Sequence, residues 1–182
     1  MDDKPEKVRV ERFNPESNYC WDNFDCGVEE LNSFLHERME KELKRRISIP
    51  HLCVIDKGAD EPLKVIGYFT LSSNSFVKSH LSNRERRKCH YSSVPCILLS
   101  KIAVDKSAQG QGLGKFLLGK AIQAAYISSR DVAVYALFLQ AREGRKQFYR
   151  DCGMIQSVCD EQYFIYPLDQ YEAEIKAMMT KR

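Results

Sequence analysis

The amino-acid sequence predicts an α/β fold with a mixed β-sheet, in a single domain that spans residues 1–182. Three observations predict this fold. Segments with the periodicity of strands alternate along the chain with segments that have the periodicity of helices. A nearly continuous apolar run at residues 95–104 is typical of a central strand that is buried on both faces. The 182 residues, of which 43% are apolar, fit one compact domain, and no repeat or linker separates a second one.

The first elements in chain order are a strand and a long helix. Residues 8–13 alternate apolar and polar side chains, as a half-buried strand does. From Val28 to Ile47 an apolar side chain recurs every three or four positions, which predicts a helix of about five turns that Pro50 ends. The apolar stripe of this helix consists of Val28, Leu31, Leu35, Met39, Leu43 and Ile47.

Three further strands complete the first half of the chain. Residues 51–56 and 63–77 predict two strands that the turn segment 57–62 joins. Residues 78–90 are polar and basic, and they predict a short helix or an exposed loop. The apolar run at 95–104 then predicts the central strand.

Helices and strands alternate through the second half of the chain. The spacing predicts a helix over 112–128, a strand over 133–140 and a helix over 142–151. A final strand is expected over 162–168, and a short helix over 169–179.

The charge is distributed unevenly along the chain. The formal net charge is +3, but residues 1–30 carry four basic and nine acidic groups, residues 31–150 carry 21 and ten, and residues 151–182 carry three and six. A basic middle with acidic ends favours a phosphate-rich partner. An ordinary solvated surface explains the same distribution, and the charge pattern alone does not separate the two.

Composition also indicates the compartment. No apolar run approaches the ~20 residues that span a bilayer, and the acidic start of the chain lacks the apolar core of a secretion signal. The seven cysteines are an odd number, and the closest are six or seven positions apart. These spacings favour reduced thiols over disulfides or a metal site. We therefore expect a cytoplasmic protein with no membrane contact and no metal.

The most informative segment is a glycine loop at residues 109–115, between the central strand and the following helix. It lacks the Gly-Lys-Ser/Thr ending of a P-loop, and Gly114 comes one residue too early for the dinucleotide-binding pattern. Backbone N–H groups that converge at the start of a helix bind an anion, preferably a diphosphate. A flexible turn at the entry to the helix remains the alternative.

The glycine loop and a second motif resemble a known family. Gln-x-x-Gly-x-Gly after a strand that ends in Ala-Val-Asp, and Phe-Tyr-Arg-Asp-Cys-Gly-Met at 148–154, are similar to the two signatures of the GCN5-related N-acetyltransferases. The resemblance implies the GNAT fold, a central mixed and mostly antiparallel sheet flanked by helices, with acetyl-CoA as co-substrate. The residues that it implies for cofactor binding are Ile102, Ala103, Val104, Gln109, Gly110, Gln111, Gly112, Leu113, Gly114 and Lys115.

Three segments resemble one subgroup of that family more closely. Residues 24–35, 95–105 and 136–141 are similar to the acetyltransferase toxins of type II toxin–antitoxin pairs. This resemblance implies acetylation of the α-amine of aminoacyl-tRNA, which stops translation, a ribbon-helix-helix antitoxin as partner, and a homodimer. Two departures are evident: Ser-Ile-Pro-His at 48–51 replaces the usual Ser-Arg-Thr-aromatic segment, and Met154 replaces an aromatic residue. The first departure bears on the acceptor and its tRNA contacts.

The resemblance assigns the proton donor to Tyr149. A phenol with a pKa of about 10 is protonated at neutral pH and can protonate the departing thiolate. The central strand carries no carboxylate at residues 98–101 that could deprotonate a lysine. An α-amine has a pKa near 8 and lysine near 10.4, so the α-amine is roughly 300 times more often neutral at pH 7 and can react without a dedicated base.

Two basic clusters are the expected tRNA contacts. Contacts of this kind fix position on the phosphates and do not read sequence. The alternative is a solvated helix face on which the cations pair with neighbouring glutamates. The two clusters consist of Arg38, Lys41, Lys44 and Arg45, and of Arg84, Arg86, Arg87 and Lys88. Two other functions stay open: acetylation of a small-molecule or protein amine, and a catalytically silent acyl-CoA-binding module.

Overall fold

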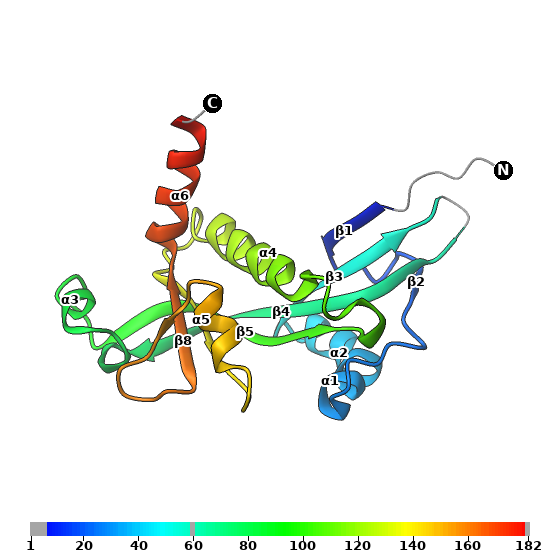
Figure 1. Ribbon diagram of the computed structural model, residues 1–182, viewed down its shortest axis with the longest axis horizontal. Helices are drawn as coiled ribbons and strands as arrows, with labels where there is room; N and C mark the ends of the chain where they lie inside the picture. Colours follow the sequence, from blue (N-terminus) through cyan, green and yellow to red (C-terminus); the bar gives the residue numbers. More distant parts are fainter. Residues whose placement is uncertain (1–6, 59–60, 181–182) are drawn as a thin grey trace. The chain divides into compact units, whose positions relative to one another are not determined.

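The computed structural model describes residues 7–58 and 61–180 (Figure 1). The chain falls into two compact units. Unit 1 comprises residues 1–71 and 101–120, and unit 2 comprises residues 72–100 and 121–182. The first six residues, residues 59–60 and the last two of the predicted domain lie outside the described residues.

The strands form the mixed, mostly antiparallel sheet that the resemblance implies. Their hydrogen-bonded order is β1-β3-β4-β5-β6-β8-β7, and β2 pairs with β4. The β1–β3, β3–β4, β6–β8 and β7–β8 pairs are antiparallel, whereas β2–β4 and β5–β6 are parallel. The strands are β1 Lys7–Arg12, β2 Tyr19–Cys20, β3 Ile49–Asp56, β4 Leu63–Val77, β5 Ser93–Val104, β6 Ala136–Gln140, β7 Ile155–Gln156 and β8 Tyr163–Pro167.

Helices cover both faces of β4 in unit 1. The Tyr68 hydroxyl donates a 2.8 Å hydrogen bond to the Leu31 carbonyl oxygen, whereas a Cβ at the adjacent Gly67 would lie 2.9 Å from Leu117. Successive strand residues point to opposite faces, so the helix that contains Leu31 and the helix that contains Leu117 lie on opposite sides of the strand. The helices are α1 Glu29–Ser33, α2 Met39–Lys44, α3 Asn83–Arg86, α4 Leu113–Ser128, α5 Lys146–Asp151 and α6 Leu168–Thr180, and the short 3-10 helices are η2 Lys78–His80 and η3 Lys106–Ala108.

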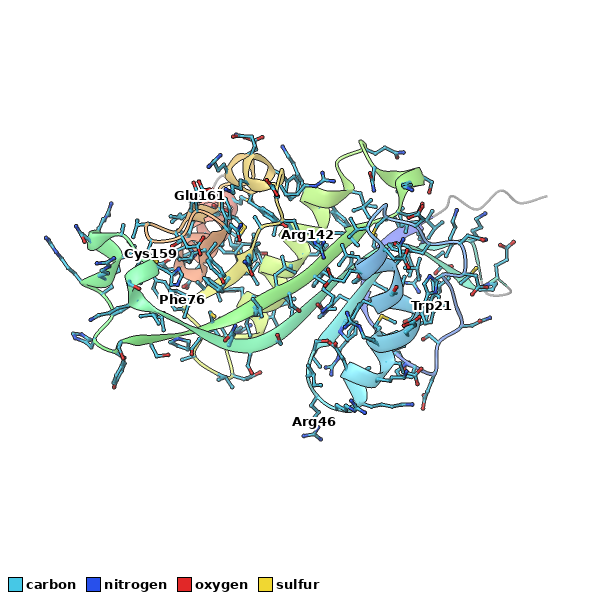
Figure 2. The ribbon with its side chains drawn as sticks, turned by 90° about the horizontal axis from the view of Figure 1, so that it is seen from below. Trp21, Arg46, Phe76, Arg142, Cys159 and Glu161 are labelled. Atoms are coloured by element: carbon cyan, nitrogen blue, oxygen red, sulfur yellow. The ribbon has the colours of Figure 1, made fainter. Side chains whose placement is uncertain are left out.

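The long first helix differs from its prediction. It contains a π-helical segment, Phe34–Arg38, between α1 and α2, and it ends at Lys44 rather than at Ile47. The chain turns at Arg46, which adopts a left-handed φ of 58° and points away from the protein in Figure 2. Ile47, predicted to lie in the apolar stripe, is therefore 54% exposed. Pro50 lies inside β3 and does not itself end the helix.

Unit 2 is built around an aromatic stack. The rings of Phe76, Phe138 and Tyr163 stack with centroid separations of 4.9 and 5.2 Å, and His80 meets them edge-on.

In this unit β6 begins three residues later than predicted, and α5 begins four residues later than predicted. Every helix in the part of the chain that the structure describes is too short or too polar to cross a membrane.

Candidate functional site

The glycine loop of unit 1 leaves its main chain open to solvent. Gly110 and Gly112 adopt left-handed φ values of 76° and 82°, and a Cβ built on either would meet no heavy atom within 4 Å. A side chain at either position would be strained, so glycine is needed for the conformation and not for close packing. Residues 109–112 are exposed immediately before α4 begins at Leu113.

The loop has the electrostatics of an anion site. The first backbone N–H groups of a helix have no partner within that helix, and they carry the positive end of its dipole. The first turn of α4 contains no acidic residue, and the Lys115 side chain beside the loop is exposed. A diphosphate could accept hydrogen bonds from these N–H groups without meeting an acidic side chain in the first turn of the helix.

Gln109 has a role that the sequence did not indicate. Its side-chain amide donates hydrogen bonds of 2.9 Å to the Val104 carbonyl oxygen and 3.1 Å to the Cys26 carbonyl oxygen. Gln111 donates a longer bond of 3.4 Å to the carbonyl oxygen of Ser107. The two glutamine side chains therefore brace the loop and leave the main chain to meet a ligand.

The segment before the loop is also fixed in place. Ala103 is buried, whereas Ile102 and Val104 are partly buried, and the Asp105 N–H donates a 2.9 Å hydrogen bond to the Ile66 carbonyl oxygen. The backbone groups predicted to pair with the pantetheine arm thus belong to a strand that is held by its neighbour. The Val104 carbonyl oxygen already accepts the hydrogen bond from Gln109.

Asp25 and its neighbours form a further polar cluster beside the loop. The Asp25 carboxylate accepts hydrogen bonds from Lys106, Asn32 and the Gly27 N–H at 2.6, 2.9 and 2.8 Å. These three donors, Lys106 first, lower the pKa of Asp25 to about 2. This cluster was not predicted from the sequence. The signal that could have indicated its turn is an aspartate followed two residues later by a glycine, as in an Asx turn.

Tyr149 lies on α5 in unit 2. Its side chain is buried and packs against Phe148 and Phe164, with ring centroids 5.0 and 5.5 Å away. Burial raises the pKa of the phenol, and the positive charges of Arg145 and Arg142 act in the opposite direction. The phenol is therefore protonated at neutral pH, as a proton donor must be.

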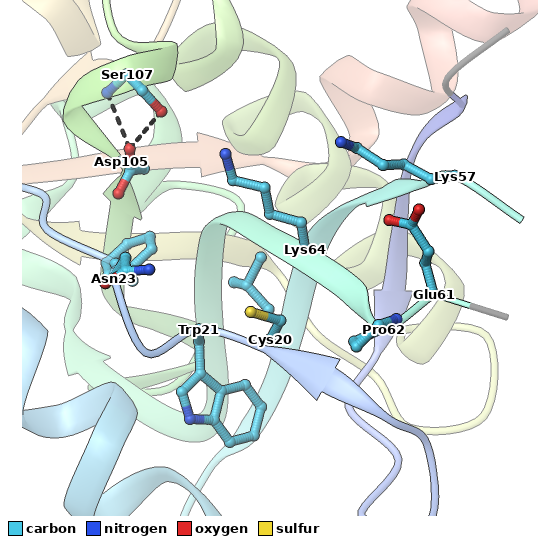
Figure 3. Close-up of a pocket in the computed structure, with 11 residues that line it drawn as sticks. Cys20, Trp21, Asn23, Lys57, Glu61, Pro62, Lys64, Asp105 and Ser107 are labelled. Carbon is cyan, nitrogen blue, oxygen red and sulfur yellow. Dashed lines mark hydrogen bonds between the residues drawn. The ribbon is translucent and has the colours of Figure 1, made fainter. Parts of the chain in front are cut away.

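A cavity of about 450 Å³ opens in unit 1 (Figure 3). Its wall includes Trp21, Asn23, Lys64, Asp105 and Ser107. Asp105 accepts hydrogen bonds from the N–H and the hydroxyl of Ser107 at 2.9 and 2.5 Å, which orient its carboxylate in this part of the wall. The sequence did not predict the cavity, because its residues come from four separate segments.

The first basic cluster is exposed on the helix of unit 1. Arg38, Lys41, Lys44 and Arg45 all reach solvent. Lys44 pairs with Glu40 at 2.7 Å, and the Arg38 guanidinium lies 5.6 Å from the centroid of the Phe34 ring. The cluster therefore presents positive charge, part of which a neighbouring glutamate balances.

The second basic cluster divides into two kinds of residue. The Arg86 guanidinium donates hydrogen bonds to the carbonyl oxygens of Leu81 and Ser79 at 2.9 and 2.6 Å, which makes it part of the local fold. Lys88 pairs with Glu85 at 3.0 Å. The side chains of Arg84 and Arg87 are exposed. Over the described ranges, 7–58 and 61–180, no three His, Cys, Asp or Glu side chains form a group that could hold a metal ion.

Comparison with known proteins gives a family match and matches to curated proteins. The model of the family described as "Acetyltransferase (GNAT) domain" matches residues 52–153. A curated protein named tRNA-acetylating toxin, from Mycobacterium tuberculosis (strain ATCC 25618 / H37Rv), is 42% identical over 84 residues. That alignment covers 43% of this chain and 50% of the relative, so the chain matches half of the length of that curated protein.

Solved structures are similar over most of the chain. A Tyr-to-Phe mutant of KacT has a TM-score of 0.85 and 31% identity, with 91% of this chain and 98% of that chain covered. AtaT complexed with acetyl-methionyl-tRNAfMet has a TM-score of 0.84 and 28% identity, with 93% and 99% covered. A Tyr-to-Phe mutant of AtaT bound to the C-terminus of the antitoxin AtaR and acetyl-CoA has a TM-score of 0.78 and 26% identity, with 92% and 98% covered.

Proposed function

Because the chain belongs to the acetyltransferase (GNAT) domain family, we propose that it transfers an acetyl group from acetyl-CoA to the α-amine of aminoacyl-tRNA. This reaction would block translation and make the protein the toxin of a toxin–antitoxin pair. The observation that carries the proposal is the similarity to AtaT complexed with acetyl-methionyl-tRNAfMet, at a TM-score of 0.84 over 93% of this chain.

The glycine loop would hold the diphosphate of acetyl-CoA. Its open main chain at Gly110 and Gly112 fits this role, because ligand oxygens can approach backbone N–H groups where no Cβ intervenes. The backbone of Ile102, Ala103 and Val104 would pair with the pantetheine arm, as an added strand does. A backbone N–H there would also polarise the thioester carbonyl.

Tyr149 would supply the proton that the leaving group needs. The neutral amine attacks the carbonyl carbon, a C–N bond forms and the C–S bond breaks. The phenol of Tyr149 gives its proton to the departing thiolate, and the proton lost by the amine restores the phenol. The raised pKa of the buried phenol supports this role, because the group is fully protonated before the reaction begins.

The absence of a base on β5 supports an α-amine as the acceptor. The residues that precede the cofactor-binding part of the strand are Leu98, Leu99, Ser100 and Lys101, none of them a carboxylate. The Lys101 ammonium lies 4.3 Å from the centroid of the Phe34 ring, so a positive charge rather than a base occupies this part of the strand. An acceptor that is often neutral at pH 7 requires no base.

The partners follow from the same proposal. Charged tRNA would lie against the exposed cations of the two basic clusters, chiefly Arg84, Arg87 and Lys41. A ribbon-helix-helix antitoxin would restrain the enzyme. The structure of AtaT bound to the C-terminus of the antitoxin AtaR supports an antitoxin as partner. We also propose that the protein works in the cytoplasm as a homodimer.

Acetyl-CoA labelled in its acetyl group, offered with bulk charged tRNA, tests the function. We expect the label to appear on the tRNA, and we expect prior deacylation of the tRNA to abolish it. Labelling of a small-molecule or protein amine instead would favour the alternative acetyltransferase. Stabilisation by acetyl-CoA with no transfer to any amine would identify a silent binding module.

A further inference from the structure

We infer that Asp25 and Asn32 are positioning residues, which hold the turn at residues 25–27 so that its Cys26 carbonyl fixes the start of the cofactor loop. This inference rests on the proposed function, because it takes coenzyme A as the ligand of the loop. Neither residue touches the ligand under this inference. Both act through Gln109, whose amide bonds the Cys26 carbonyl oxygen at 3.1 Å.

Two hydrogen bonds of the Asp25 main chain join the turn to the strand–loop junction. The Lys106 N–H donates a 2.8 Å hydrogen bond to the Asp25 carbonyl oxygen. The Asp25 N–H in turn donates a 2.9 Å hydrogen bond to the carboxylate of Asp105. The N–H and the carbonyl of Asp25 thereby attach the turn to Asp105 and Lys106, which follow the central strand and precede the glycine loop.

Asn32 shapes the turn from α1. Its side-chain carbonyl accepts hydrogen bonds from the Cys26 N–H at 3.0 Å and from the Cys26 thiol at 3.1 Å, while its amide donates to Asp25 at 2.9 Å. Gly27 follows with a φ of 83°, a conformation that suits glycine. Asn32 thus orients the peptide group between Asp25 and Cys26, and its amide also holds the Asp25 carboxylate. That carboxylate bonds the Gly27 N–H, which belongs to the same planar peptide group as the Cys26 carbonyl, so both side chains set the direction of the carbonyl that Gln109 meets.

The Lys106–Asp25 ion pair also balances charge beside the loop. The Asp25 carboxylate carries a full negative charge at neutral pH, close to a loop that must accept an anion. The Lys106 ammonium, 2.6 Å away, neutralises it. Without Lys106 the carboxylate would repel a diphosphate, and the loop would lose part of its affinity.

The cluster contributes more to the loop than to the stability of the fold. The Lys106 and Asp25 side chains are 61% and 48% exposed, and exposed ion pairs add little to folding stability. The Asp25, Asn32 and Lys106 side chains are not members of the apolar core of unit 1, although the Cys26 side chain of the turn packs against that core. Loss of these hydrogen bonds should therefore weaken ligand binding more than it lowers the free energy of unfolding.

The first test compares Asn32→Ala with Asn14→Ala by calorimetry with coenzyme A. Asn14 is a matched control, because its side chain also stabilises a turn of unit 1, through a 3.1 Å hydrogen bond from the Glu16 N–H. We expect Asn32→Ala to weaken coenzyme A binding about tenfold and to raise KM for acetyl-CoA in parallel. The kcat at saturating acetyl-CoA and the KM for charged tRNA should stay within about twofold of the wild type.

The second test separates charge from geometry and does not depend on the folding of Asn32→Ala. We expect Lys106→Met to weaken coenzyme A binding about tenfold. The double variant, which carries Asp25→Asn as well as Lys106→Met, should recover part of the lost affinity. An amide at position 25 can still accept the hydrogen bonds from Gly27 and Asn32 but carries no charge. A merely structural role predicts that the double variant binds no better than the single one.

The outcomes distinguish this inference from the proposed function. Wild-type protein that does not bind coenzyme A would overturn both the proposed function and the positioning role. Wild-type protein that binds, together with an Asn32→Ala variant that binds equally well, would overturn only the positioning role. A double variant that recovers no affinity would likewise overturn the charge-balance argument.

Discussion

The side-chain amide of Gln109 donates a 3.1 Å hydrogen bond to the carbonyl oxygen of Cys26, which lies 83 positions earlier in the chain. This contact joins the turn before the first helix, which lies in the segment 24–35 that resembles the toxin subgroup, to the glycine loop before α4. The two motifs therefore belong to one structural unit. A change in the turn should therefore also alter the loop.

Removal of the Tyr149 hydroxyl should abolish transfer and spare binding. We expect Tyr149→Phe to lower kcat about 100-fold or more, because a positioned proton donor contributes roughly 10²–10⁴-fold. The affinity for acetyl-CoA should not change, and growth arrest should be lost. Tyr171→Phe is the matched control, since it also removes one tyrosine hydroxyl from unit 2, where its ring packs against Tyr126. Full toxicity of Tyr149→Phe would remove the role assigned to this residue.

A methyl group in the glycine loop should weaken cofactor binding. We expect Gly112→Ala to raise the Kd for coenzyme A about tenfold, because the left-handed φ strains an alanine and the Cβ would enter the space that the ligand needs. Gly153→Ala, at a φ of 78°, carries the same strain in unit 2 and serves as the control. Calorimetry measures the Kd of each variant for coenzyme A, and thermal melting measures the stability of each. Equal affinities in the two would argue against the loop as the diphosphate site.

Exposed arginines of the second basic cluster should set the salt dependence of tRNA binding. We expect Arg84→Gln and Arg87→Gln each to reduce the slope of log K against log salt by about 0.7–0.9, the value for one phosphate contact. Lys176→Gln, which removes a cation from α6, should leave the slope unchanged. Arg86→Gln should instead lower the melting temperature, because its guanidinium bonds two backbone carbonyl oxygens. Unchanged slopes would identify Arg84 and Arg87 as ordinary solvated residues.

His51 should make the fold sensitive to mild acid. Burial lowers the pKa of His51 to about 4, and its Nδ1 has no hydrogen-bond partner among the described residues. Because the unfolded chain binds this proton near pH 6.5, the stability that the neutral imidazole contributes is complete above that pH. It is lost as the pH falls from about 6.5 to about 4, by about 3 kcal/mol at most.

His51→Phe should remove this loss. The phenyl ring keeps the stacking on Phe69, which lies 4.7 Å away, and cannot take up a proton. We expect the free energy of unfolding of the variant to vary less between pH 6.5 and pH 4 than that of the wild type, measured by urea denaturation. His36→Gln, at an exposed position of the first helix, is the control. Parallel curves for wild type and His51→Phe would contradict the argument.

The sequence predicted the elements whose patterns are long and local. The strand at 63–77 is confirmed at both ends, and the helix predicted at 112–128 begins at Leu113. The glycine loop was predicted because its signal lies within seven consecutive residues. Strands β2 and β7 were missed, because two residues are too few for any periodicity to appear.

Interactions between distant residues explain the rest. The pairing of Asp25 with Lys106 depends on how the chain folds back over 81 positions, which no local pattern encodes. The π-helical segment escaped prediction because an apolar recurrence of three or four residues does not exclude one wider turn. Arg86 looked like one of four equivalent cations, and only the structure shows its guanidinium bonded to the backbone.

The most direct test of the central claim is mass analysis of total aminoacyl-tRNA after brief expression of the protein. If the chain acetylates aminoacyl-tRNA, the aminoacyl groups should gain the mass of one acetyl group at the α-amine, and expression of Tyr149→Phe should leave them unmodified. Growth arrest with every aminoacyl group unmodified would contradict the account.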